Sequence, residues 1–215
     1  MKVLILSEKG NGISLGQRLM KENHDVDIFI QDDRYSRAGM GLVNKAESWR
    51  PLVSSADLVI ADMAGFTKEE RAIRAMGKAY FGSSELTDMM ELDSGKGAAL
   101  LKGVGMSVPA TSAAPVGIEL NVGGWWNGRG WEEPFHYIFV DRKFLVSDLG
   151  PDATSMCSVM IQAERSNRLL RDTILRMEPF LSRTLYRGPV GLDVVINEHG
   201  ICAIRATAHI NHSIE

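Results

Sequence analysis

The chain begins with MKVLILSEKGNGISLGQRLM, residues 1–20, and this stretch decides the fold of its first half. Residues 2–7 form a short apolar run typical of a buried strand, and from Ile13 onward the apolar residues recur at helical spacing. The glycines between them fit G-x-G-x-x-x-G, one residue off the dinucleotide-binding fingerprint. Because glycine admits close backbone approach and a helix N-terminus favours an anion, Gly10, Asn11 and Gly12 are candidate phosphate-binding residues. A strand-to-helix turn without a ligand has the same pattern.

Strands and helices continue to alternate up to about residue 82. Further strands are expected at 26–30, 57–61 and 78–81, with helical stretches around Pro51 and at 68–76. This order predicts a parallel sheet with right-handed crossovers, closed by one or two helices over 84–105. Candidate carboxylates follow the second and third strands, at the edge where such sheets bind ligands, and solvated loop carboxylates are the alternative. They are Asp32, Asp33 and Asp62.

The pattern changes after a segment with two prolines and small residues at 107–115. Two β-rich runs then meet at Asn127-Gly128, a strong hairpin signal, and a long helical region with a break near Pro179 follows. The expected elements are strands at 116–122 and 131–140, a helix over 161–185, and strands at 191–197 and 200–207. The second half is therefore predicted to be α+β, which divides the chain into domains at 1–106 and 117–215 with a linker at 107–116.

The composition and net charge argue against binding to nucleic acid or membrane. The 215 residues carry 24 Lys and Arg against 27 Asp and Glu, a net charge of -3, so a basic nucleic-acid footprint is not expected. No apolar run approaches the length of a membrane span, and the two cysteines stand far apart, which favours a reduced compartment. We therefore expect a cytoplasmic protein that binds neither nucleic acid nor membrane.

Three further clusters could carry chemistry. Tryptophans at 125, 126 and 131 flank the hairpin turn, where packing against the core is favoured over stacking on a base. Residues 148–156 are rich in short polar groups and backbone N–H donors, which suits phosphate, although a plain turn has the same composition. His209 and His212, with Asn211 between them, could bind a metal only if a third ligand approaches, and a frayed terminus is the alternative.

Several short motifs occur in order along the chain. They are YFG at 80–82, MELDSGK at 90–96, VGMSVP at 104–109, GIELNVGGWWNG at 117–128, DLGPDATSM at 148–156, YRGPVGLD at 186–193 and IRATAH at 204–209. Together with the opening strand and glycine turn, they resemble the phosphoribosylamine-glycine ligases of the ATP-grasp superfamily, especially their phage-type forms. The resemblance implies α/β plus α+β architecture: an N-terminal Rossmann-like (pre-ATP-grasp) parallel sheet, then a truncated ATP-grasp core with antiparallel strands.

The resemblance also implies an activity that this sequence departs from. That family joins glycine to phosphoribosylamine through an acyl phosphate made from ATP, with Mg²⁺ held by oxygen ligands. Here residues 110–116 stand in place of the family's lid subdomain, and Arg205 and Thr207 stand at its metal-binding Glu and Asn positions. His209 takes the place of an arginine, and the family's carboxyl-terminal domain is not expected within this chain.

Three functions remain open. The first is a degenerate relative without ligase activity that binds a small phosphorylated molecule or a protein. The second is an active carboxylate-amine ligase that uses ATP and Mg²⁺, with Glu119 and Asp193 as metal ligands and a lid from a partner chain. The third is a structural scaffold, for example a homo-oligomer. The candidate ligand-binding residues are Gly10, Asn11, Gly12, Glu119, Asp148, Gly150, Pro151, Asp152, Thr154, Ser155 and Asp193.

Overall fold

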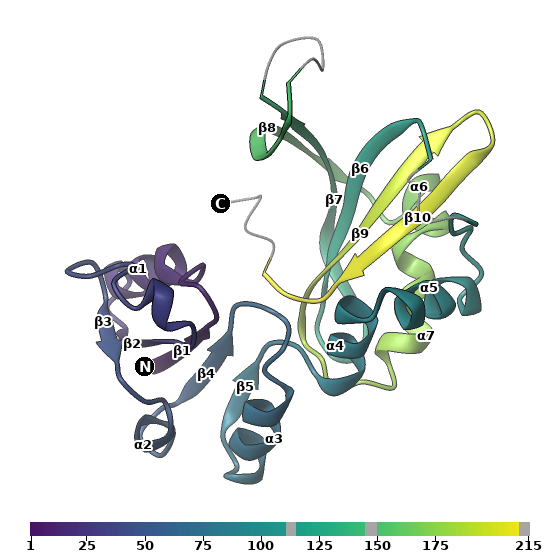
Figure 1. Cartoon of the computed structure of the whole chain (residues 1–215). Helices are drawn as coiled ribbons and strands as arrows, with labels where there is room; N and C mark the ends of the chain where they lie inside the picture. The colour runs from purple at the N-terminus through teal and green to yellow at the C-terminus, as the bar shows by residue number, and fades with distance from the viewer. Residues whose placement is uncertain (111–114, 145–149, 211–215) are drawn as a thin grey trace. The chain divides into compact units, whose positions relative to one another are not determined.

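A computed structural model describes residues 1–110, 115–144 and 150–210, with the backbone alone at 141–143 and 152–156. The chain divides into two compact units, Met1–Asp88 and Met89–Glu215. Each unit contains one five-stranded sheet, parallel in the first and antiparallel in the second (Figure 1). This confirms the predicted fold class.

The first unit is built on a parallel sheet with strand order β3-β2-β1-β4-β5. Its strands are β1 (Lys2–Ser7), β2 (Asp25–Ile30), β3 (Asn44–Ala46), β4 (Leu58–Ala61) and β5 (Ala79–Phe81). The central strand β1 is buried from Val3 to Ser7, as a parallel strand covered on both faces requires.

Helices cover this sheet and close its core. They are α1 (Ile13–Lys21), a short 3-10 turn η1 (Asp33–Tyr35), α2 (Arg50–Val53) and α3 (Thr67–Ala75). Helix α1 packs closely because Gly16 has no side chain, and a Cβ there would lie 2.7 Å from the Ile28 side chain. The core includes Leu6, Trp49 and Phe66, the N-cap residue of α3.

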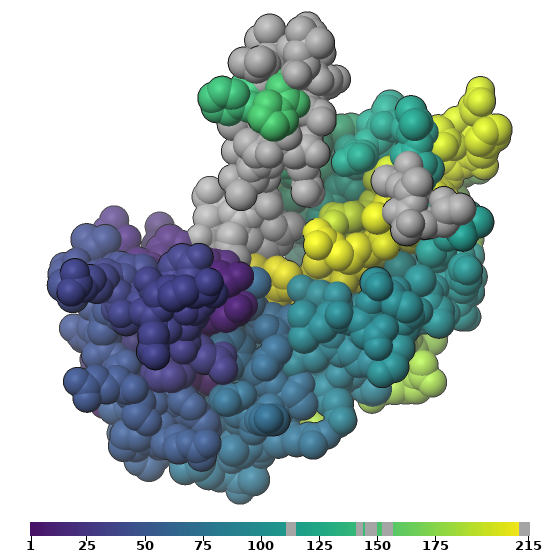
Figure 2. Space-filling view, viewed as in Figure 1, coloured from purple at the N-terminus to yellow at the C-terminus, as the bar shows by residue number. Residues whose placement is uncertain are grey.

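The second unit is built on an antiparallel sheet with strand order β10-β9-β6-β7-β8. Its strands are β6 (Ile118–Trp126), β7 (Trp131–Lys143), β8 (Asp152–Ala163), β9 (Gly188–Asn197) and β10 (Gly200–Thr207). Part of the β9–β10 hairpin lies at the surface in the view of Figure 2, where it is yellow. Between α5 and β6 the described residues contain no helix or strand.

The hairpin predicted at Asn127-Gly128 joins β6 to β7. The Asn127 side chain accepts hydrogen bonds from the Arg129 and Gly130 backbone N–H groups at 2.8 and 2.9 Å, and Gly128 has a φ of 94°. Trp126 and Trp131 are buried, with ring centroids 5.4 Å apart, so two of the turn's tryptophans pack in the core as predicted.

Short helices cover one face of the second sheet. They are α4 (Glu85–Leu92), within which the division between the units falls, α5 (Ser94–Gly103), α6 (Arg168–Asp172), the 3-10 turn η3 (Ile174–Met177) and α7 (Glu178–Leu181). Leu101 of α5 belongs to the core of this unit, so α5 does not close the first sheet as expected. None of the described helices is long and apolar enough to cross a membrane.

Three sequence predictions of secondary structure were wrong. The segment 152–156 is the start of strand β8, although a loop was expected there. The long helix expected over 161–185 begins only at Arg168, because β8 continues to Ala163, and it is broken at Thr173, whose φ and ψ are -128° and -103°. Strand β3 was missed because its residues carry no apolar alternation.

Candidate functional site

The glycine loop of the first unit is occupied by a carboxylate of the chain itself. Asp62, which is fully buried at the end of β4, accepts hydrogen bonds from the Gly12 backbone N–H at 2.6 Å and from the Ser7 hydroxyl at 2.5 Å. The Gly10 N–H in turn donates to the Ser7 hydroxyl oxygen at 2.8 Å. Asp62 therefore holds the position at the start of α1 that an external anion would take in a phosphate loop.

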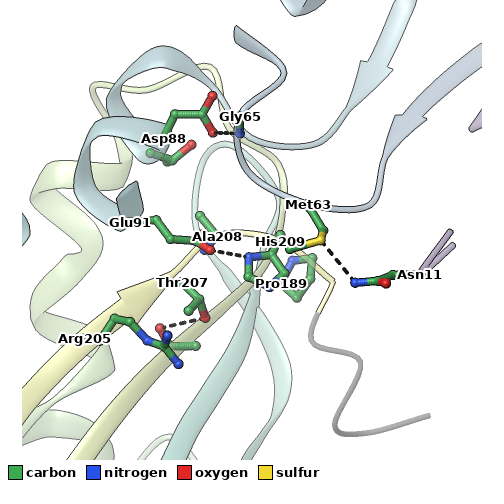
Figure 3. Close-up of polar contacts among 12 residues, drawn as sticks. Asn11, Met63, Gly65, Asp88, Glu91, Pro189, Arg205, Thr207, Ala208 and His209 are labelled. Carbon is green, nitrogen blue, oxygen red and sulfur yellow. Dashed lines mark hydrogen bonds and ion pairs between the residues drawn. The ribbon is translucent and has the colours of Figure 1, made fainter. Parts of the chain in front are cut away.

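The other predicted residues near this loop make local contacts. Asn11 donates through its side-chain amide to the Met63 sulfur at 3.1 Å (Figure 3). Asp32 caps η1 by accepting from the Arg34 backbone and guanidinium, and these hydrogen bonds lower the pKa of the Asp32 carboxyl. Asp32 adds no cation for a phosphate at Gly12, and the N–H of that glycine already has an acceptor within the chain.

The second unit has a pocket on the sheet face opposite its helices. Its volume is about 340 Å³, and its polar side chains come from three neighbouring strands: Glu119 and Asn121 from β6, Asp193 from β9 and Arg205 from β10. Asn121, Asp193 and Arg205 are direct register partners across these strands. Because Leu120 on β6 faces the core, alternation directs its two neighbours to the pocket side.

The pocket's central carboxylate is fully engaged. Asp193 accepts one hydrogen bond from the Asn121 amide at 2.8 Å, and its other oxygen accepts from Arg205 Nη2 at 2.8 Å and Nε at 3.2 Å. The Thr207 hydroxyl donates to the Gly191 carbonyl oxygen at 3.4 Å. The structure thus brings the predicted residues Glu119 and Asp193 into one pocket, together with Arg205.

These residues do not fit a magnesium ion. Mg²⁺ needs several oxygen ligands, whereas here a guanidinium already lies against Asp193, one of the two described carboxylates that line the pocket. Within the described part of the chain, no group of three or more His, Cys, Asp or Glu side chains could hold a metal ion.

His136 on β7 is a pocket-face residue that the sequence analysis missed. It pairs in register with Gly123, and a Cβ on that glycine would clash with the imidazole, so the ring lies over the bare backbone of β6. Partial burial lowers the pKa of His136 and favours its neutral form. The signal in the sequence was the Gly123-Gly124 pair in the middle of strand β6.

Glu91 is a second residue whose role the sequence did not reveal. It lies on α4 and accepts a hydrogen bond from the Ala208 N–H at 2.9 Å, while its other oxygen lies 2.7 Å from His209 Nδ1 (Figure 3). Both side chains are largely buried, with exposed fractions of 11% for Glu91 and 15% for His209. The hydrogen bond from Ala208 to Glu91 therefore holds the chain just after β10, and the other members of the predicted metal cluster of His209, Asn211 and His212, lie outside the described residues.

The predicted phosphate loop at 148–156 is only partly described. Asp148 lies outside the described residues, Gly150 is buried, and the Pro151 carbonyl oxygen accepts a hydrogen bond from the Phe144 N–H at 3.1 Å. The backbone of Asp152, Thr154 and Ser155 belongs to strand β8, but the structure does not describe their side chains. Their role in binding stays a prediction.

Comparisons with known proteins show the fold. No protein-family model matches the chain, and no curated protein matches it by sequence. Among solved structures, it is similar to N5-carboxyaminoimidazole ribonucleotide synthetase from Thermus thermophilus, with a TM-score of 0.68 and 9% identity over 97% of this chain and 71% of that one. Phosphoribosylamine–glycine ligase from Thermotoga maritima gives a TM-score of 0.63 and 14% identity over 97% and 68%.

A protein assigned to the ATP-grasp superfamily from Archaeoglobus fulgidus gives a TM-score of 0.61 and 14% identity over 100% of this chain and 83% of that one. The chain therefore has the fold of ATP-grasp proteins. At these identities the likeness does not extend to substrates or to the narrower glycine-ligase family.

Proposed function

We propose that this chain is a non-catalytic relative of the ATP-grasp carboxylate-amine ligases. It keeps the two-sheet scaffold but does not transfer a phosphoryl group from ATP. The observation that carries the proposal is the ion pair between Arg205 and Asp193, 2.8 Å long, in the middle of the pocket. The sequence resemblance assigns the Arg205 position to a metal-binding glutamate, and a guanidinium in that place repels a divalent cation.

The missing lid supports the same conclusion independently. Phosphoryl transfer requires cations around the triphosphate and a site closed from water. Residues 110–116 are too few to supply either, whereas the resemblance places a whole subdomain there. Loss of the lid and loss of the metal ligand remove two separate parts of one mechanism.

The charge of the pocket indicates which ligands suit it. The lining side chains that the structure describes include two carboxylates, Glu119 and Asp193, and one cation, Arg205, so the described side chains together carry a net negative charge. This balance disfavours a phosphorylated ligand there and favours a small molecule that offers an amine or hydrogen-bond donors to Glu119. Phosphate binding then depends on residues 148–155, because Asp62 already satisfies the Gly12 N–H.

Calorimetry with ATP and Mg²⁺, together with an assay for ADP release, tests the proposal. We expect neither Mg²⁺-dependent ATP binding nor ADP formation with the wild-type chain. A double substitution, Arg205→Glu with Thr207→Asn, restores the ligand types of the family and is expected to gain Mg²⁺ binding, with Arg187→Glu as a control outside the pocket. ADP formation by the wild type that disappears on Asp193→Asn would refute the proposal.

A second candidate is an active ligase with an unusual site. The observation in its favour is that Glu119 and Asp193 line the same pocket. In that case Arg205 would have to release Asp193 when metal binds, and a thermal-shift screen against adenine nucleotides with and without Mg²⁺ would detect the exchange. If neither nucleotides nor phosphoribosyl compounds shift the thermal midpoint, the active-ligase candidate is rejected in favour of the non-catalytic function.

A further inference from the structure

The second sheet ends in an unusual edge strand. In the strand order β10-β9-β6-β7-β8, β8 pairs with β7 on one side, and no other described strand pairs with its outer edge. We call residues 157–163, with the sequence CSVMIQA, the edge segment. Unpaired strand edges offer rows of backbone donors and acceptors that can pair with another chain.

The edge segment lacks the features that protect such strands. It contains no charged residue, proline or glycine. Its pairing with β7 is regular from Ala163, opposite Phe135, to Cys157, opposite Asp141, and the one register shift in this strand pair lies beyond it, between Asp141 and Lys143. Charges, prolines and bulges are the usual means of blocking edge-to-edge pairing, and the edge segment contains none of them.

Apolar side chains of the edge segment are exposed on both faces of the sheet. The exposed fractions are 54% for Val159, 49% for Met160 and 40% for Ile161. Val159 and Ile161 share a face with Phe139 of β7, which is itself 37% exposed. A strand added beside β8 would therefore extend the apolar face of the sheet as well as its hydrogen-bond ladder.

The order of residue types in the segment indicates what that strand is. Around Met160 it is a chemical palindrome: β-branched Val159 and Ile161, then polar Ser158 and Gln162, then small Cys157 and Ala163. Paired antiparallel with an identical segment, each residue meets one of its own type, and no charge meets a like charge. A two-fold axis through Met160 satisfies all these pairs at once.

We propose that β8 pairs with β8 of a second copy of this chain, antiparallel about Met160, and joins the two five-stranded sheets into one. Each copy then contributes a Val159 to the partner's Ile161, and cross-strand pairs of this kind stabilise a sheet by roughly 0.2–1 kcal/mol each. The dimer leaves the pocket residues on β6, β9 and β10 untouched, because β7 lies between them and the interface.

Sedimentation of the full chain over a micromolar to submillimolar range tests the dimer. The 23.7 kDa chain is expected to associate to twice its mass. Met160→Lys places two like charges on the axis and should weaken association at least about tenfold. The matched control is Met76→Lys, which charges a residue of similar exposure, 51%, in the other unit and should leave association unchanged.

Disulfide trapping tests the register and does not depend on how the lysine variant folds. In a Cys157→Ser, Cys202→Ser background, Met160→Cys should form a chain-to-chain disulfide under mild oxidation, while Met76→Cys should not. A wild type that stays monomeric, an unchanged association constant in a folded Met160→Lys variant, or equal trapping at both positions would each overturn the proposal. If the wild type stays monomeric, the partner of the β8 edge would have to be a strand from a different protein.

Discussion

Replacing Asp62 with alanine removes the acceptor that fills the glycine loop of the first unit. The loop loses the bond to the Gly12 N–H at 2.6 Å and the bond to the Ser7 hydroxyl at 2.5 Å, both shielded from water. A hydrogen bond to a charged group contributes about 1.5–3 kcal/mol, and a buried N–H left without an acceptor costs about 1–3 kcal/mol. The Ser7 hydroxyl oxygen still accepts from the Gly10 N–H, so the loss of its bond to Asp62 costs less free energy than the loss of the Gly12 bond. We expect the free energy of unfolding of this unit to fall by about 2–4 kcal/mol.

Hydrogen exchange resolved to peptides of the first unit, measured along a urea series, gives this free energy separately from that of the second unit. Asp57→Ala is the matched control, because the Asp57 carboxylate accepts the Lys2 N–H at 2.7 Å at the other end of the same strand, in an exposed position. That variant should lose less than about 1 kcal/mol. The role of Asp62 in the loop would be refuted if both variants lost the same free energy of unfolding and the Gly12 amide stayed protected from exchange in Asp62→Ala.

Three further predictions concern the second unit. Burial lowers the pKa of His136, so as the pH falls the imidazole is protonated in the unfolded chain before it is protonated in the folded one. The stability that this residue contributes is therefore full above about pH 6.5 and is lost as the pH falls towards the folded pKa. Urea melts between about pH 5 and 8 should show that His136→Gln loses less stability on acidification than the wild type. Glu91→Ala should destabilise the unit by about 1–3 kcal/mol because the buried Ala208 N–H loses its acceptor, and Glu91→Gln, which keeps an oxygen there, should lose less in the same melts. Gly97→Ala would drive a methyl group into the Met90 carbonyl and should lower the thermal midpoint, whereas Gly103→Ala, which meets nothing nearby, should not.

The sequence predicted the middle of the parallel sheet well because strands β1 and β4 are buried on both faces. Val3 to Leu6 on β1 and Leu58 to Ala61 on β4 are continuous apolar runs, which strand patterns detect directly. Strand β8 escaped detection for the opposite reason. An edge strand with Val159, Met160 and Ile161 in succession shows no period of two, and the apolar residues from 161 onward were taken for a helix.

The sequence did not reveal which contacts the candidate site residues make. Strand order alone placed Asp62 at the same edge as the glycine loop, but the hydrogen bond that satisfies Gly12 depends on how closely the loop folds over the strand end. The amide of Asn121 was missed because a polar residue in a strand is typical of a solvent-facing position, and its partner Asp193 lies 72 residues away in the sequence. Long-range pairs of this kind have no local signature.

The Arg205–Asp193 pair also bears on how such a protein could evolve. The two residues face each other directly across β9 and β10, so a single change of Arg205 to an acid would set two like charges side by side. Such an intermediate is destabilised unless a cation is already bound, and removing Asp193 first would discard one of the oxygens a metal would need. A route from this pair to a metal site by single substitutions therefore either passes through a less stable intermediate or loses an oxygen ligand, so the pair resists such a change.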